Sequence, residues 1–425
     1  MHVTNALLAT FVAIGQVSAV PVSAVPVSAV PVSPWVVQPI KKVQLGPRPY
    51  YLVDSLSPGP LKDKLASCTE MEMKSSTWSL GHRGGGTLLI PEESRESLMA
   101  GARMGAGIQE CDVSFTKDHV LVCRHSQCDL HTTTNIVAIP ELNAKCKTPF
   151  RPAANNGTQP AAAECCTSDL TIAEFKSLCA KMDGFNASAT TPEDYLHGTL
   201  SWRSDLYGSC AQVMTLQEYI TLVGSLGLKF TTEIKTPMIP MPFQGNYTQE
   251  MFVQQMIDTL KANGIAPADV FIQSFLYSDI QYMLKHEPAF GQQAIFLDPT
   301  GGPGTVEASI DSLTTYAQEG LRIIAPPIGF LVEADGDKIV PSRYALKAKE
   351  LGLQIITWSL ERSPPVAQIK AEGDYYYDSI KGLLRTDGDI YTVLDVLWQQ
   401  VGVFGVFSDW SATATFYANC FGIGI

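Results

Sequence analysis

Eight short β-type runs recur along the chain, and segments with helical periodicity separate most of them. The β-type runs are Thr77–His82, Gly107–Val113, Lys229–Lys235, Val270–Ser274, Ala294–Asp298, Leu321–Ala325, Gln354–Ser359 and Val403–Ser408. The helical segments are Arg95–Met104, Leu216–Leu226, Gln249–Asn263, Ser278–Lys285, Val306–Gln318, Arg343–Leu351 and Tyr391–Gln399. Strands that alternate with helices favour an α/β fold with a parallel sheet, and eight of them favour a closed (β/α)₈ barrel, the TIM barrel, over an open sheet.

One connection is much longer than such a barrel normally contains. It runs from Ser126 to Met214, after the hairpin of the second strand, whereas loops above ~15 residues without structure of their own are uncommon. Five of the ten cysteines lie between Cys128 and Cys179. We therefore predict a cysteine-rich insertion at about residues 126–214, held by disulfides, with a helix near Ile172–Lys181, on the active-site side of the barrel.

The N-terminus has the features of a targeting signal. The apolar run Ala6–Ile14 is too short to span a bilayer, which takes ~20 apolar residues, and Val17-Ser18-Ala19 follows as a small-x-small cleavage pattern. A buried N-terminal helix is the alternative. From Val17 to Pro34 a Val-Ser-Ala-Val-Pro pentad repeats, and its prolines block helices and central strands. We predict an extended chain over this repeat, and we assign a signal peptide to 1–19, a repeat-containing leader and linker to 20–70, and the barrel with its insertion to 71–425.

The ten cysteines are consistent with an oxidising compartment. Their number is even and no pair has zinc-ribbon spacing, so disulfides are expected, although their pairing cannot be read from the sequence. Glycosylation sequons begin at Asn156, Asn186 and Asn246. We expect a secreted, extracellular glycoprotein, either released or associated with a cell wall. The apolar end Phe416–Ile425 is too short for a membrane anchor and is expected to pack against the barrel, with Cys420 as a disulfide partner.

Composition and charge narrow the class of partner. Hydrophobic residues make up 45% of the chain and charged residues 17%, which is typical of a globular protein. The net charge of −12 argues against a nucleic acid or an anionic membrane surface as the main partner. A small anionic substrate can still bind where local positive charge offsets this field. The oligomeric state is left open.

The first candidate site segment ends the first predicted strand. Gly81-His82-Arg83-Gly84-Gly85-Gly86 would place His82 and Arg83 at the C-terminal rim of a barrel, where active sites lie. The glycines would allow the backbone to approach a ligand closely. The alternative is an ordinary glycine turn.

The second candidate segment is a pair of carboxylates on the second predicted strand. Glu110 and Asp112 are two residues apart and share a face, whereas Cys111 points to the other face as a packing residue or disulfide partner. Two such carboxylates inside a barrel repel each other unless a cation lies between them, and a hard divalent cation prefers oxygen ligands. A solvent-facing acidic pair is the alternative.

A hairpin brings a second histidine toward these carboxylates. Thr116–His119 reads as a tight turn, and the returning run Val120–His125 would place His125 beside Glu110 and Asp112. A histidine near a metal can donate a proton to a leaving group. The alternative is a surface histidine.

Glu233 and Lys235 complete the set at the end of the third predicted strand. By parity they share a face, so Glu233 can be a third carboxylate and Lys235 a cationic clamp for phosphate. A simple ion pair between them is the alternative. Together, two histidines, three carboxylates and two fixed cations are the groups that phosphodiester cleavage requires.

These segments occur in an order that resembles the glycerophosphodiester phosphodiesterase family. The resemblance begins with Gly81-His82-Arg83-Gly84, Pro91-Glu92-Glu93-Ser94, Glu110-Cys111-Asp112-Val113, Thr116-Lys117-Asp118-His119 and Arg124-His125. It continues with Asp129–Asn135, Leu170–Glu174, Met214–Glu218, Glu233–Lys235, Gln273–Phe275, Thr357-Trp358 and Ser408-Asp409. It covers about residues 77–410.

The resemblance implies a barrel enzyme with one divalent metal ion, Ca²⁺ or Mg²⁺. By this resemblance the metal ligands are Glu110, Asp112 and Glu233, the acid/base pair is His82 and His125, and Arg83 contacts phosphate. Glu92 and Trp358 would lie behind these groups or contact the substrate. The implied reaction is attack of a glycerol hydroxyl on phosphorus followed by water, which yields glycerol 3-phosphate and an alcohol such as choline.

Three departures from the family pattern affect this expectation. Pro-Glu-Glu-Ser replaces Pro-Glu-Asn-Thr, so Glu92 is retained while its neighbour at 93 changes. His119 replaces the turn glycine, which can require φ > 0, and histidine tolerates that conformation well enough for the hairpin to persist. The insertion can reshape access to the site. None of the three removes a proposed catalytic group.

Two other functions remain open. A phospholipase acting on lyso- or intact lipids could use the same barrel and metal, but it would need an apolar rim at the barrel mouth. A secreted binding protein on an inactive barrel is a different class, and the presence of both histidines with all three carboxylates argues against it. A two-carboxylate glycosidase would not need the histidines or the cations.

Overall fold

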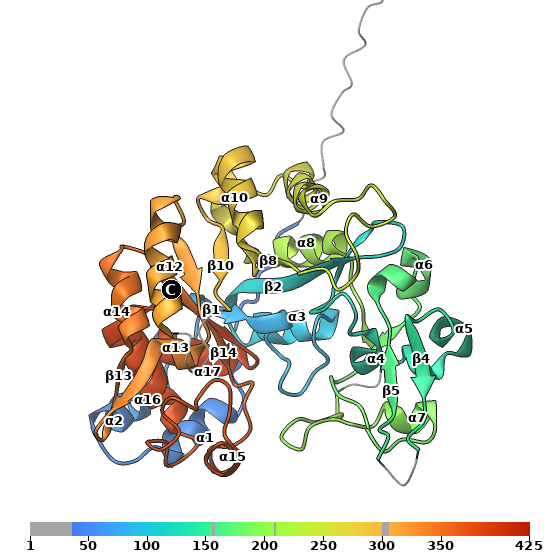
Figure 1. The fold of residues 1–425 in the computed structure, drawn as a ribbon. Helices are drawn as coiled ribbons and strands as arrows, with labels where there is room; N and C mark the ends of the chain where they lie inside the picture. The colour runs from blue at the N-terminus through green and yellow to red at the C-terminus, as the bar shows by residue number, and fades with distance from the viewer. Residues whose placement is uncertain (1–35, 155–157, 208–209, 300–305) are drawn as a thin grey trace, which may run out of the picture. The chain divides into compact units, whose positions relative to one another are not determined.

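A closed barrel of eight parallel strands forms the centre of the molecule (Figure 1). The computed structural model describes residues 36–154, 158–207, 210–299 and 306–425, so the predicted signal peptide and the proline repeat lie outside the described residues. The barrel strands are β1 (Ser76–Gly81), β2 (Ala106–Phe115), β8 (Lys229–Ile234), β9 (Val270–Ser274), β10 (Ile295–Leu297), β11 (Ile323–Ala325), β14 (Gln354–Leu360) and β15 (Gly405–Ser408). Pairing of β1 with both β2 and β15 closes the barrel and confirms the predicted (β/α)₈ architecture.

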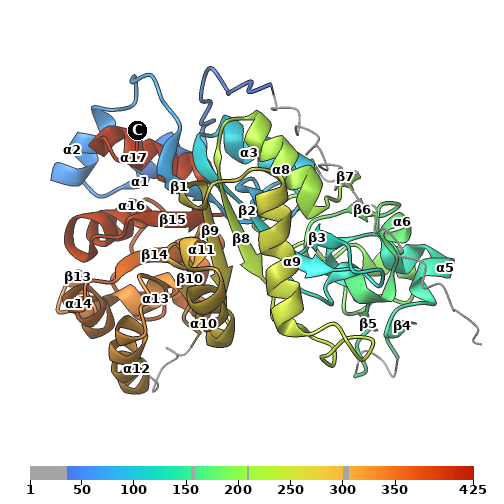
Figure 2. The same ribbon diagram turned by 90° about the horizontal axis from the view of Figure 1, so that it is seen from above.

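Helices surround the barrel, and all seven predicted helical segments are present (Figure 2). They are α3 (Arg95–Arg103), α8 (Leu216–Ser225), α9 (Gln249–Ala262), α10 (Tyr277–His286), α12 (Val306–Gln318), α14 (Arg343–Glu350) and α16 (Asp389–Val396), which continues as a π-helical turn over Leu397–Val401. Capping residues fix several starts: the side chains of Ser94, Thr215, Thr248 and Ser342 each accept a hydrogen bond from the backbone three residues on. None of the helices among the described residues is long and apolar enough to cross a membrane.

Shorter elements complete the barrel domain. They are α11 (Pro288–Gly291), α13 (Ile328–Leu331), the hairpin β12 (Val332–Asp335) and β13 (Lys338–Pro341), α15 (Val366–Glu372), and 3₁₀ turns at His82–Gly84 and Pro267–Asp269. Strand β3 (Leu121–Cys123) runs antiparallel to β2 and forms the predicted hairpin. At its turn, His119 adopts φ 60° with the hairpin intact, as expected.

Part of the predicted leader and linker is folded. Residues 20–70 were assigned to a leader and linker, with an extended chain expected over the proline repeat, but α1 (Arg48–Ser55) and α2 (Pro60–Ala66) form in the linker part and bury apolar side chains. The proline repeat ends before these helices, so the reason for expecting an extended chain does not apply to them. Figures 1 and 2 show both helices near α17 (Ser411–Phe421), which was not predicted as a helix.

A disulfide joins this N-terminal segment to the C-terminal helix. Cys68, just after α2, bonds to Cys420 in α17, so the C-terminal segment is held as expected. The two cysteines are 352 residues apart in sequence, and a cross-link across so long a loop removes much conformational entropy from the unfolded chain.

We expect the double variant Cys68→Ser/Cys420→Ser to be less stable by about 4–5 kcal/mol because of this lost constraint. For a barrel of this size that corresponds to a melting midpoint lowered by roughly 5 °C. Thermal unfolding followed by circular dichroism measures the change, with mass spectrometry as the check that the other disulfides remain oxidised. An unchanged midpoint would contradict the cross-linking role.

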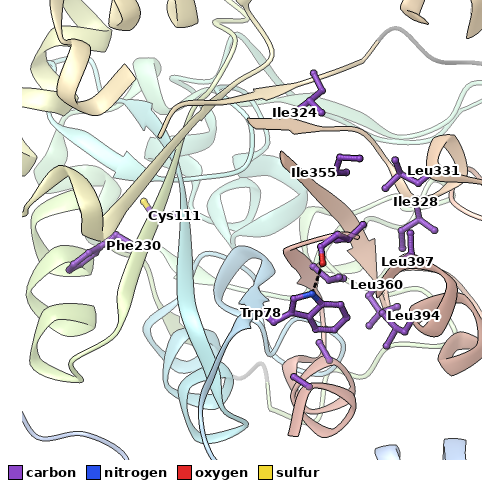
Figure 3. Close-up of a cluster of buried hydrophobic side chains, with 14 of the residues drawn as sticks. Trp78, Cys111, Phe230, Ile324, Ile328, Leu331, Ile355, Leu360, Leu394 and Leu397 are labelled. Atoms are coloured by element: carbon purple, nitrogen blue, oxygen red, sulfur yellow. Dashed lines mark hydrogen bonds between the residues drawn. The ribbon is translucent and has the colours of Figure 1, made fainter. Parts of the chain in front are cut away.

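Two apolar layers hold the barrel. The interior is filled by side chains such as Leu80, Ile108 and Phe407, while a larger cluster packs between strands and helices. Figure 3 shows part of this outer cluster around Trp78, whose indole N–H donates to the carbonyl of Val403 at 2.8 Å. Because the barrel is filled, chemistry is restricted to its ends.

The predicted insertion is a folded unit with a core of its own. Its elements are α4 (Leu130–Thr133), α5 (Pro140–Asn143), β4 (Thr148–Arg151), β5 (Ala162–Glu164), α6 (Ile172–Phe175), β6 (Cys179–Ala180), α7 (Pro192–Tyr195) and β7 (Ala211–Gln212), with 3₁₀ turns at Ile136–Ala138 and Thr167–Asp169. Three disulfides staple it: Cys128–Cys166, Cys146–Cys165 and Cys179–Cys210. The predicted helix at 172–181 is shorter than expected, since Cys179 and Ala180 pair with β7 instead. The sequon at Asn156 lies outside the described residues.

Candidate active site

The three predicted metal ligands come from neighbouring strands and point into the end of the barrel. Glu110 and Asp112 lie on β2, and Asp112 is in register with Glu233 on β8. All three are buried. Glu110 is held on both oxygens, by the side-chain amide of Gln273 at 2.8 Å and by the backbone N–H of Arg83 at 2.7 Å.

Crowding of negative charge dominates the electrostatics of this cluster. Burial and the neighbouring Asp112 raise the pKa of Glu110 well above its usual range. Burial raises the pKa of Glu233 to about 8, although Lys235 lowers it. Burial also acts to raise the pKa of Asp112, but Lys235 and Arg83 outweigh it and lower that pKa. The positive charges of Arg83 and Lys235 therefore do not fully offset the repulsion among these carboxylates.

The donor set fits a hard divalent cation. Among the described residues, neither carboxylate oxygen of Asp112 accepts a hydrogen bond, although both are buried. A bound cation would give these oxygens a partner and would relieve the repulsion that raises the neighbouring pKa values. The carboxylate oxygens of Glu110, Asp112 and Glu233 do not all lie within 4.8 Å of one another. Binding of one cation by all three would therefore require their side chains to move closer together.

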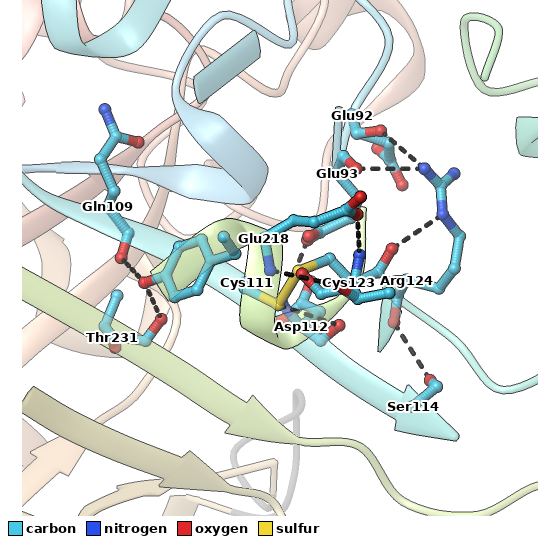
Figure 4. The surroundings of a disulfide bond; sticks show 12 residues. Glu92, Glu93, Gln109, Cys111, Asp112, Ser114, Cys123, Arg124, Glu218 and Thr231 are labelled. Atoms are coloured by element: carbon cyan, nitrogen blue, oxygen red, sulfur yellow. Dashed lines mark hydrogen bonds between the residues drawn. A yellow bond between two sulfur atoms is a disulfide. The ribbon is translucent and has the colours of Figure 1, made fainter. Parts of the chain in front are cut away.

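A fourth carboxylate, Glu93, extends this cluster. It occupies the position where the family pattern has asparagine, takes φ 54°, and is buried. Its side-chain oxygen accepts a hydrogen bond from the backbone N–H of Asp112 at 3.3 Å. Burial and Asp112 raise the pKa of Glu93 well above its usual range. Arg124 holds this loop by donating to the carbonyl of Glu93 at 3.2 Å (Figure 4).

A disulfide lies on the other face of β2. Cys111 bonds to Cys123 on β3, as expected for a residue on the face opposite to Glu110 and Asp112 (Figure 4). The two sulfur atoms lie within 4.8 Å of the Glu93 carboxylate. The bond ties the strand of Glu110 and Asp112 to the segment that leads into His125. The two parts of the site therefore share a cross-linked support.

His82 forms a buried pair with Asp409. Its Nδ1 contacts Asp409 Oδ1, and its Nε2 lies 3.4 Å from the hydroxyl of Ser359. Burial lowers the pKa of His82, although the contact with Asp409 acts to raise it. Burial would raise the pKa of Asp409, but Arg362, His82 and Arg203 hold it well below its usual range.

Arg83 connects the two halves of the site. Its Nη1 donates to both oxygens of Glu92, at 2.9 and 3.0 Å, and its Nε lies 3.7 Å from Asp112 Oδ2. Its backbone is left-handed, with φ 50°, which is unusual for a residue other than glycine and is typical of functional sites. Glu92, which this chain shares with the family pattern, therefore contacts the guanidinium of Arg83.

Two of the glycines after Arg83 are required by close packing within the protein. A Cβ on Gly84 would lie 2.5 Å from the hydroxyl oxygen of Ser97, and a Cβ on Gly85 would lie 2.2 Å from that of Ser411. No side chain fits between these segments. The alternative of a structural glycine turn therefore describes these two positions.

His125 lies with Glu92 and Asp129. The ligand atoms of these three residues lie within 4.8 Å of one another. The hairpin does return beside β2, because Arg124 N–H donates to the carbonyl of Asp112 at 2.7 Å. Burial and the positive charges of Arg83 and other cations lower the pKa of His125 well below its usual range. A dication is not favoured at this trio, because Arg83 already neutralises Glu92.

Lys235 and Trp358 lie at the barrel mouth. Lys235 Nζ is 2.7 Å from Glu233 Oε1, so these two residues form the ion pair that was considered as an alternative. The same Nζ lies 5.8 Å from the ring centre of Phe275. Trp358 donates its indole N–H to the carbonyl of Ala325, contacts Phe275 edge-on and stacks on Tyr375. An aromatic wall therefore flanks the lysine.

Sequence reasoning gave no role to several residues of this site. Asp409 follows the eighth strand directly, a position at the C-terminal barrel end that could have marked it. Gln273 is the last residue but one of the fourth barrel strand, β9, and has the parity of an inward residue. Arg362 and Arg203 had no such signal, since both lie in loops; Arg203 belongs to the insertion.

The chain is similar to known proteins over most of its length. The model of the glycerophosphoryl diester phosphodiesterase family matches residues 82–360. An extracellular protein of Arthroderma benhamiae is 48% identical over 247 residues, which are 57% of this chain and 100% of that protein. Glycerophosphodiester phosphodiesterase GDPD6 of Arabidopsis thaliana is 23% identical, with 80% of this chain and 85% of that protein covered.

A solved structure shows the same fold. The crystal structure of a protein from Silicibacter pomeroyi, assigned as a glycerophosphoryl diester phosphodiesterase, superposes with a TM-score of 0.51 at 16% identity. The match covers 85% of this chain and 98% of that one. Because the family model spans well over half of the sequence, the chain belongs to the glycerophosphoryl diester phosphodiesterase family, a family of phosphoric diester hydrolases.

Proposed function

We propose that the protein hydrolyses glycerophosphodiesters such as glycerophosphocholine to glycerol 3-phosphate and an alcohol, with one divalent metal ion and the pair His82 and His125. The observation that carries this proposal is the His82–Asp409 pair beside a buried carboxylate cluster whose Asp112 oxygens lack hydrogen-bond partners among the described residues. A binding protein would have no need for such a costly arrangement of buried charge.

Glu110, Asp112 and Glu233 would hold the metal ion. When bound, Ca²⁺ or Mg²⁺ would neutralise charge on the phosphate and help to position it. Arg83 and Lys235 are the two fixed cations whose charges lower the pKa of Asp112, and they would bind the remaining phosphate oxygens. Arg83 stays in place because Glu92 holds its guanidinium.

The two histidines would move the protons. One histidine would accept the proton of the attacking glycerol hydroxyl, while the other, which takes up a proton from solvent before this step, would give that proton to the departing alcohol oxygen. The lowered pKa values of both histidines favour the neutral form that accepts a proton. Their roles would reverse when water opens the cyclic phosphodiester intermediate. His82 is suited to carrying positive charge because ionised Asp409 contacts its Nδ1.

We also propose that the protein is secreted. Five disulfides and a relative described as an extracellular protein support this. The sequons at Asn186 and Asn246 would then be open to glycosylation, and Asn246 is exposed.

A lipid substrate is the second candidate, and exposed apolar side chains favour it. Leu206 and Tyr207 of the insertion are 75% and 57% exposed, and Tyr375, in the loop after α15, is 56% exposed. The two loops adjoin, since Leu200 and Tyr376 line the same cavity. Such side chains could contact the acyl chain of a lysophospholipid.

Activity assays with and without EDTA test the proposal. The protein as secreted by its host should release glycerol 3-phosphate from glycerophosphocholine, lose this activity in EDTA, and regain it with the preferred cation, so separate additions of Ca²⁺ and Mg²⁺ identify the metal. Lysophosphatidylcholine, run in parallel, tests the lipid candidate. A folded, metal-replete protein that cleaves none of several glycerophosphodiesters would overturn the proposal.

A further inference from the structure

Arg203 extends from the insertion into the polar network around His82. It lies in the described segment between α7 and Tyr207, and its side chain is only 6% exposed. Its Nη2 lies 2.6 Å from Asp409 Oδ2 and also donates to the carbonyl of Arg362 at 3.4 Å, while its Nη1 donates to the carbonyl of Thr87. All these contacts are with the barrel.

The three contacts tie neighbouring strand ends together. Thr87 lies in the loop that follows β1, Arg362 follows β14 by two residues, and Asp409 comes directly after β15. These strands are adjacent in the order β1, β15, β14. One guanidinium from the insertion therefore joins three consecutive corners of the C-terminal barrel end.

The contact with Asp409 bears directly on His82. Asp409 uses Oδ1 for His82 Nδ1, and its Oδ2 is held by Arg203 and, at 3.0 Å, by Arg362. A carboxylate held on both oxygens cannot rotate away from the imidazole. On the basis of the proposed function, we infer that Arg203 is a positioning residue, which fixes Asp409 and thereby the orientation of His82.

Arg362 does not make Arg203 redundant. The side chain of Arg362 is 21% exposed and is shared between Asp409 and Glu92, whose Oε2 lies 3.6 Å away. Arg203 is more deeply buried and is held from its own side, because its N–H donates to the carbonyl of Leu200 and the Cys179–Cys210 disulfide spans its segment. The insertion thus completes the surroundings of His82.

Kinetics of Arg203 variants test this role. Arg203→Met should lower kcat on glycerophosphocholine by about 10–100-fold, the loss typical of a residue that orients a reacting group, with KM changed by less than ~3-fold. Arg203→Lys should recover part of the loss, because it restores the charge without the forked geometry. Arg151→Met, at an exposed position of the same insertion, is the matched control and should behave as wild type.

Rescue by added guanidinium distinguishes two roles for Arg203: orienting Asp409 and His82, or only holding the insertion against the barrel. Arg203 and Arg362 line a cavity of about 310 Å³, through which guanidinium can reach the space left in Arg203→Met. Restored kcat at an unchanged melting midpoint supports positioning. Activity of Arg203→Met within twofold of wild type, or a loss that follows the melting midpoint and is not rescued, would overturn the inference.

A spectroscopic readout needs no substrate and so distinguishes this inference from the proposed function. In protein labelled with ¹⁵N-histidine, the Nδ1 proton of His82 should give a downfield signal that Asp409→Asn removes. Arg203→Met should shift or broaden it. An unchanged signal would overturn the positioning role, whereas a wild-type protein inactive on all glycerophosphodiesters would overturn the proposed function alone.

Discussion

Replacing His82 by alanine is expected to lower kcat on glycerophosphocholine by about 10²–10⁴-fold, the contribution typical of a positioned acid or base. The imidazole is buried and its Nδ1 contacts Asp409, so its Nε2 is the nitrogen available for proton transfer. The alanine variant keeps the carboxylate cluster and the two cations, Arg83 and Lys235, that are proposed to bind phosphate. KM should therefore change much less than kcat.

Asp409→Asn extends this test to the partner of His82. An amide cannot stabilise a protonated imidazole as a carboxylate does, and the interaction with Arg203 and Arg362 is weakened at the same time. We expect a fall in kcat of roughly 10²-fold. His197→Ala, an exposed histidine of the insertion, serves as the control and should keep full activity. Activity of His82→Ala within tenfold of wild type would remove His82 from the proposed mechanism.

The barrel was predictable because its signals are local. Buried strands read as short β-type runs, and helix starts are marked by capping residues such as Thr215, which forms a capping box with Glu218. The position of the insertion followed from the length of the connection alone. The disulfide pairing of the insertion could not be predicted from the sequence. The partners of Cys128 and Cys146 are the adjacent residues Cys166 and Cys165, and spacing cannot distinguish the two possible pairings.

Parity and register explain which parts of the site the sequence could reveal. Glu110 and Asp112 share a face on any strand, and Glu233 joins them because β8 pairs with β2 in register. The pair of His82 with Asp409 spans 327 residues and exists only because β15 closes the barrel against β1. No local pattern contains that contact, and the same holds for Arg203.

Removing one carboxylate from the cluster should strongly weaken metal binding while leaving the fold intact. Asp112→Asn keeps the shape of the side chain but removes a charge whose two oxygens lack hydrogen-bond partners among the described residues. Loss of a residue that only orients a metal ligand typically lowers metal affinity by roughly 10–100-fold. Asp112 is proposed to be a ligand itself, so we expect the affinity for Ca²⁺ or Mg²⁺ to fall by more than that. Activity should fall with it.

Thermal shift measures this loss without a substrate. A ligand at 100 times its Kd stabilises the folded state by about 2.7 kcal/mol, which for a chain of this size raises the melting midpoint by roughly 3 °C. Wild type should show this rise on addition of the metal, and so should Asp335→Asn, which removes an exposed aspartate from the β12–β13 hairpin. Asp112→Asn should not. A full shift in Asp112→Asn would mean that the ion binds elsewhere. The metal would then have no role in the reaction proposed for His82.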